Sequence, residues 1–119
     1  MGALRPKELS AAKAAIPALL ETLQDQDEIV RITAAEAIVK IDRTQSSNTV
    51  PTLVELLQEQ NFTVRLRSVD LLRQMGAEAA LALPALEKAT QDEASIVRVW
   101  AAEAIEQVRQ TDTNRASGK

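Results

Sequence analysis

The sequence contains neither cysteine nor histidine, and Phe62 and Trp100 are its only aromatic residues. Without thiols or imidazoles the chain cannot form disulfides, zinc sites of the Cys/His type, or a catalytic triad with histidine as the base. Glycine occurs only 3 times, and the sequence shows neither a glycine-rich phosphate loop nor a nucleophile–base pair. We therefore expect a protein that is not an enzyme and that uses neither a cofactor nor a metal ion.

Long apolar runs and a field of one charge are also missing. No apolar run approaches the roughly 18 residues that a membrane span requires. The first ten residues, MGALRPKELS, lack the apolar stretch of a signal peptide. The 14 basic and 17 acidic residues are interspersed and give a net charge of −3, so no basic patch is available for a phosphate backbone. The sequence predicts a cytoplasmic protein that binds neither membranes nor nucleic acid.

The residues that are abundant favour helices. Ala, Leu, Val and Ile supply nearly all of the 45% hydrophobic content. Together with Glu, Gln and Arg they form a helix-favouring composition in which the aromatic strand formers are almost missing. A chain of 119 residues has room for one domain with one continuous core. The composition therefore predicts a single all-α domain.

One pattern occurs three times along the chain. VRITAAEAI (30–38), VRLRSVDLL (64–72) and VRVWAAEAI (97–105) are separated by 34 and 33 residues, and a proline precedes each phrase by 13 residues, at Pro17, Pro51 and Pro84. An internal repeat at this period is typical of a stacked architecture in which each unit contacts only its neighbours. We predict repeats at about 4–42, 46–76 and 77–110 within one domain (1–110), followed by a flexible C-terminal tail (111–119).

Each unit reads as two helices joined by a short polar turn. The first helix contains the proline, and around Pro17 and Pro84 we expect a longer helix kinked there. Asp27 and Asn61 are good N-caps for the second helix. The apolar stripe on that helix faces the first helix and is formed in the first unit by Val30, Ala34, Ala37, Ile38 and Ile41. Segment 42–48 reads as the longest loop, and Gly76 as the end of a helix.

These motifs resemble the HEAT-repeat superfamily, in particular its short bacterial repeats named after phycobilisome lyases. Those repeats combine a proline-containing first helix, an Asp-rich turn, and a second helix that begins Val-Arg and continues Ala-Ala-Glu-Ala. Segments 16–41 and 83–108 are similar throughout, and the middle unit is weaker after VRLR. The resemblance implies a right-handed α-solenoid of three stacked helix-turn-helix repeats. It also implies a protein-interaction scaffold, with a bilin lyase or chromophore chaperone as the alternative.

A basic and an acidic residue recur together in every unit. The arginines could bind a phosphate or carboxylate from a ligand. The favoured interpretation is a structural ladder, in which each arginine reaches an acidic residue in a turn of its own or a neighbouring unit. The residues of this ladder are Arg31, Arg65 and Arg98 with Asp25, Glu59 and Asp92.

A second group of recurring positions lies away from the predicted core stripe. Its aliphatic members either pack between adjacent second helices or line a concave surface that binds another protein. Its acidic members suit a basic amphipathic helix or peptide, and Trp100, at a position that is polar in the other units, is a candidate anchor. The predicted partner-binding residues are Ile32, Leu66, Val99, Trp100, Glu36, Asp70 and Glu103.

The two ends of the repeat region differ in character. In the third unit the first-helix positions Glu87 and Thr90 are polar, as expected of a terminal repeat that covers the stack. At the other end, Met1-Gly2-Ala3 repeats Met75-Gly76-Ala77. This similarity raises the further expectation that the chain is part of a longer repeat array.

Overall fold

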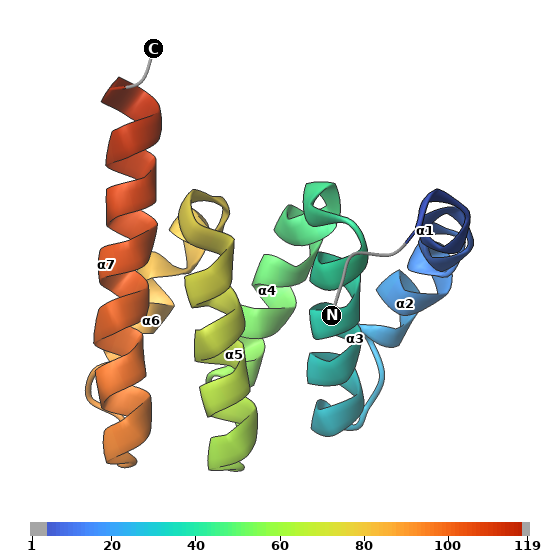
Figure 1. Cartoon of the computed structure of the whole chain (residues 1–119). Helices are drawn as coiled ribbons and strands as arrows, with labels where there is room; N and C mark the ends of the chain where they lie inside the picture. The colour runs from blue at the N-terminus through green and yellow to red at the C-terminus, as the bar shows by residue number, and fades with distance from the viewer. Residues whose placement is uncertain (1–4, 118–119) are drawn as a thin grey trace.

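The computed structural model describes residues 5–117, and the side chains of residues 5–110, as helices joined by short turns. Figure 1 shows α3, α5 and α7 in one layer and α2, α4 and α6 in a second layer behind it. The Cα radius of gyration is 14.6 Å, against about 13.5 Å for a compact domain of this length. This all-α solenoid confirms the predicted fold class. Its elements are α1 (Pro6–Lys13), α2 (Ile16–Thr22), α3 (Glu28–Ile41), η1 (Arg43–Gln45), α4 (Ser46–Leu56), α5 (Phe62–Met75), η2 (Gly76–Ala82), α6 (Leu83–Ala89) and α7 (Ser95–Ser117).

The predicted ends of the second helices are confirmed. The Asp27 carboxylate accepts a hydrogen bond of 2.8 Å from the backbone N–H of Ile29 at the start of α3. The Asn61 side chain likewise accepts one of 2.9 Å from Thr63 N–H at the start of α5. Each bond satisfies a donor that has no partner inside the helix. Gly76 ends α5 with φ 63°, a conformation that costs a residue with a Cβ considerably more.

The first helices differ from the expectation in detail. Instead of one kinked helix, the chain breaks shortly before Pro17 and Pro84, because α1 ends at Lys13 and the 3₁₀ segment η2 precedes α6. In the second unit Pro51 lies inside α4. Segment 42–48 is therefore not a loop: it holds η1, whose Thr44 N–H is bonded to the Asp42 carboxylate at 3.1 Å, and the start of α4.

The C-terminal region also departs from the expectation. α7 continues without a break to Ser117, so residues 111–117 are helical where a loose tail was expected. Residues 95–117 contain no glycine or proline that would end the helix, so a helix established by the third repeat can continue past it. Residues 118–119 lie outside the described residues, as do residues 1–4 and with them the predicted similarity of Met1-Gly2-Ala3 to the helix end at Met75-Gly76-Ala77.

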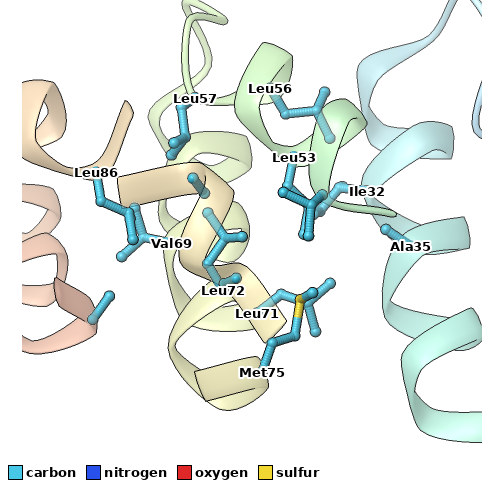
Figure 2. Close-up of a cluster of buried hydrophobic side chains, with 14 of the residues drawn as sticks. Ile32, Ala35, Leu53, Leu56, Leu57, Val69, Leu71, Leu72, Met75 and Leu86 are labelled. Carbon is cyan, nitrogen blue, oxygen red and sulfur yellow. The ribbon is translucent and has the colours of Figure 1, made fainter. Parts of the chain in front are cut away.

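The central unit holds the best-buried part of the core. Leu53 and Leu56 of α4 and Leu72 of α5 are fully buried. Figure 2 shows Ile32 pointing from α3 toward Leu53, which places a side chain of the first unit against the second. The hydrophobic core is thus continuous through the stack, with no separate core for each unit.

Equivalent positions of the three units show how each second helix packs on both of its neighbours. The first position, occupied by Val30, Val64 and Val97, is partly exposed in the first unit and fully buried in the other two. Two residues further on the trend is reversed, because Ile32 is fully buried, Leu66 partly buried and Val99 53% exposed. We call the first position the leading edge, facing the preceding unit, and the second the trailing edge, facing the following unit. The leading edge is most exposed at the N-terminal end of the stack and the trailing edge at the C-terminal end.

Candidate functional site

The second helices present a row of polar side chains between their two edges. Because an α-helix turns by 100° per residue, the repeat positions three, six and ten residues after the leading edge share one side of each helix. Nearly all of these side chains are exposed or partly exposed. We call this surface the second-helix face; its residues are Thr33, Glu36, Lys40, Arg67, Asp70, Gln74, Trp100, Glu103 and Gln107.

A groove of about 530 Å³ runs along this face between α3 and α5. Val39 and Leu71, both almost completely buried, contribute the apolar part of its lining. Charged and amide side chains supply the remainder: Glu36, Lys40, Arg43, Arg67, Asp70 and Gln74. The groove therefore offers both hydrogen-bond donors and acceptors beside a small apolar part of its lining.

Two of the three predicted acidic residues are already paired within the chain. Glu36 receives two hydrogen bonds from Arg67 across the α3–α5 boundary, Nε to Oε2 at 3.0 Å and Nη2 to Oε1 at 2.6 Å. The hydrogen bonds to Glu36 raise the pKa of the Arg67 guanidinium above its usual value. Asp70 receives hydrogen bonds from Arg73 (3.2 Å) and Gln74 (2.9 Å) on its own helix. The third predicted acidic residue, Glu103, is exposed and forms no ion pair with any side chain of residues 5–110.

Trp100 lies at the α5–α7 boundary. Its ring is partly buried and packs against the hydrophobic core. The Arg73 guanidinium lies over it, with Cζ 5.9 Å from the ring centroid, within the range of a cation–π interaction. The exposed part of the ring belongs to the second-helix face, and its buried part covers the junction between two units.

The structure separates the seven predicted binding residues into three groups. Ile32 and Leu66 lie on the trailing edges of α3 and α5 and pack against the core. Of the two alternatives expected for them, packing between units describes Ile32, which is fully buried and does not line an exposed surface. The aliphatic positions recur because each unit needs them for stacking. Val99 is exposed because its trailing edge has no following unit. The remaining residues, Glu36, Asp70, Trp100 and Glu103, share the second-helix face.

The structure forms two ion pairs of the predicted arginine ladder, and both run in one direction. Arg31 pairs with Glu59 of the following unit at 3.2 Å. Arg65 pairs with Asp92 of the following unit through two hydrogen bonds, Nε to Oδ2 at 2.7 Å and Nη2 to Oδ1 at 3.1 Å. Arg98, in the third unit, donates to the carbonyl of Asp92 in its own turn at 2.8 Å. The ladder thus connects successive units and is structural in its inner positions.

Burial and hydrogen bonding act in opposite directions on Asp92. Desolvation raises the pKa of its carboxyl group, but the hydrogen bonds from Arg65 and from the backbone N–H of Ala94 outweigh it and leave the pKa below its usual value. The carboxylate is therefore charged at neutral pH and remains a strong acceptor for Arg65.

Sequence reasoning missed the arginines that neutralise the acidic row. Arg67 and Arg73 occupy positions that hold other residue types in the first and third units, so no repeating signal marks them. Arg43, which donates to the Gln74 carbonyl at 3.1 Å, lies in a segment that was expected to be a loop. Non-repeating residues of this kind are where one unit is adapted to a particular neighbour or ligand.

No helix in the described part of the chain is long and apolar enough to cross a membrane. Within the same residues, no group of three or more carboxylates is arranged to hold a metal ion.

Comparison with known proteins agrees with the architecture. No curated protein matches the chain significantly in sequence. A family model for HEAT repeats matches residues 16–106, which covers most of the chain and includes part or all of each predicted unit. The match agrees with the paired helices, the inter-unit ladder and the continuous core. The chain therefore belongs to the HEAT-repeat family.

Proposed function

We propose that this protein is a non-catalytic scaffold that binds a segment of another protein along the groove between α3 and α5. Membership of the HEAT-repeat family supports a role as a repeat scaffold. The observation that supports this particular site is the groove of about 530 Å³, whose almost buried floor residues Val39 and Leu71 are bordered by charged and amide side chains.

The partner that fits this groove is polar and carries charges of both signs. Three cations, Lys40, Arg43 and Arg67, line it together with two carboxylates, Glu36 and Asp70. Because each carboxylate already has an arginine partner, a purely basic peptide would gain little from them. A peptide with alternating acidic and amide or basic side chains would find a donor or an acceptor at each step. Exposed Glu103 and the open part of Trp100 extend the same face toward α7.

The test uses peptides selected on the wild-type protein from a random peptide library, with affinities measured by fluorescence polarisation. Gln74 lines the groove, and Gln107 is the equivalent residue of α7 outside it. Both are exposed, so Gln74→Arg and Gln107→Arg form a matched pair. Gln74→Arg should weaken binding at least about tenfold by narrowing the groove, and Gln107→Arg should change it little. Equal affinities for the two variants would reject the groove as the binding site.

A further inference from the structure

At the C-terminal end of the stack, Arg98 lacks the carboxylate partner that Arg65 has. Arg65 directs Nη1 to two carbonyls of its own turn and Nε and Nη2 to Asp92. Arg98 makes the first set of contacts in the same way, with Nη1 bonded to the carbonyls of Asp92 and Glu93 at 2.8 and 3.3 Å. Among residues 5–110, however, no carboxylate pairs with it. The Arg98 guanidinium is therefore held in position for an acid that residues 5–110 do not supply.

The matching acceptor lies at the other end of the stack. The Asp92 carboxylate accepts a hydrogen bond of 2.9 Å from the backbone N–H of Ala94, and this bond orients the carboxylate toward Arg65. Asp25, the equivalent residue of the first unit, accepts the N–H of Asp27 at 2.8 Å in the same manner. Within the described part of the chain no arginine or lysine pairs with Asp25. Both halves of a ladder pair are thus oriented and unpaired, at opposite ends of one molecule.

The apolar surfaces at the two ends are complementary in the same sense. An apolar groove of about 270 Å³ lies at the N-terminal end between α2 and α3, lined by Leu19, Thr22, Ile29, Val30, Thr33, Ala34 and Ala37. At the C-terminal end, α7 exposes Val99 and Ala102 on its trailing edge. Inside the stack, leading-edge and trailing-edge residues at these positions bury one another. The ends of the stack repeat the two sides of an interface that the chain already forms twice.

We propose that copies of this chain associate head to tail, with the trailing edge of α7 of one copy packed into the N-terminal groove of the next. In this arrangement Arg98 of one copy pairs with Asp25 of the following copy and extends the ladder. The occupant is a second copy because the charges and the apolar edges of both surfaces are those of the internal junctions. The proposal uses the ends of the stack, so it does not depend on a ligand in the groove between α3 and α5.

The contact between copies should be weak, and it should allow chains longer than a dimer. The C-terminal end also carries Glu87, which forms an exposed ion pair with Arg109. These polar groups limit the apolar area that a junction can bury, so association should depend on concentration in the manner of small interfaces. Because the two surfaces differ, a junction leaves one free surface of each kind, and growth continues beyond the dimer.

Sedimentation equilibrium of the full chain tests the proposal directly. From about 10 µM to about 1 mM, the range that detects weak contacts, the average mass should rise past that of a dimer. A mass that stays at 12.9 kDa throughout would overturn the proposal. Val99→Asp, a change at an exposed position, should reduce association at least about tenfold without changing the melting temperature. An unchanged mass profile for this variant would also overturn it.

A charge exchange identifies the pairing. Arg98→Glu and Asp25→Arg each place like charges at the junction and should weaken association at least about tenfold. An equimolar mixture of the two variants should recover wild-type association, because every junction then joins opposite charges. A symmetric contact between two α7 edges would instead be insensitive to Asp25→Arg, and this result would refute the head-to-tail arrangement. Lys88→Glu, whose amine faces Gln58 inside the chain, is the matched charge-reversal control.

Discussion

Replacing Asp92 by asparagine should lower the free energy of unfolding by about 2–4 kcal/mol, because it breaks a largely buried ion pair while keeping the shape of the side chain. The side chains of Arg65 and Asp92 are 8% and 10% exposed, so water cannot replace the lost interaction well. Removing one partner of a fully buried pair costs about 3–5 kcal/mol. The asparagine amide keeps one oxygen that can accept a hydrogen bond from the guanidinium, so the expected loss of unfolding free energy lies toward the lower end of that range.

The equivalent ladder position in the preceding unit supplies the control. Glu59 pairs with Arg31 at 3.2 Å, but these side chains are 35% and 15% exposed. Glu59→Gln is the same carboxylate-to-amide change in a wetter site, where exposed ion pairs contribute about 0.2–1 kcal/mol. Added salt should reduce this smaller loss further and leave the loss for Asp92→Asn nearly unchanged.

Urea titrations monitored by circular dichroism and by the fluorescence of Trp100, the single tryptophan, measure both losses. The midpoint should shift to lower urea with an unchanged slope, which shows that stability changed and the exposed area did not. If the two amide variants lose the same free energy, burial does not determine the strength of the ladder. The reasoning would then be refuted.

Three further outcomes are expected in the same assay. Leu72→Ala should lower the free energy of unfolding by about 2–5 kcal/mol because it empties a fully buried position of the central unit. Glu87→Ala should lower it by less than about 1 kcal/mol because the ion pair of Glu87 with Arg109 is exposed. Equal losses for the two variants would show that the core is wrongly placed. Because the pKa of the Asp92 carboxyl is lower in the folded chain than its unfolded value of about 3.9, its contribution is present above that pH and is lost as the pH falls through the folded-state pKa. As the pH is lowered, the free energy of unfolding should therefore fall less for Asp92→Asn than for wild type. Gly76→Ala should cost about 1–3 kcal/mol, since φ 63° and ψ −133° suit only glycine, and a melting temperature equal to that of wild type would contradict this.

The sequence was sufficient to predict features that repeat. The ladder could be inferred because Arg65 and Asp92 each have counterparts in the other units at the same offsets. The helix starts at Asp27 and Asn61 were predictable because capping is local chemistry that a few residues determine. The direction of the ladder, from each arginine to the following unit, was not predictable, since repetition alone does not distinguish a contact within a unit from one between units.

The position of Ile32 shows why the surface was harder to predict. The second helix α5 contacts its own first helix, α4, and both other second helices, and α3 contacts α2, α4 and α5. Their apolar residues therefore do not form the single stripe that was assumed. Val64 at the leading edge of α5 and Ile32 at the trailing edge of α3 are both fully buried, on different sides of their helices. Contacts such as Arg67 with Glu36 join residues 31 positions apart and occur at one boundary only, so no periodic signal reveals them.

The uneven burial along the stack has a consequence for its dynamics. α1 contributes no buried residue and α2 only Ile16, so opening this hairpin exposes little apolar area and should require less free energy than opening α4 or α5. Amide protons of α1 and α2 should consequently exchange with solvent earlier than those of the central helices. Since this hairpin borders the N-terminal groove, a copy bound there would restrain its opening. Each docking event would then order the segment beside it, and ordering and assembly would become thermodynamically coupled.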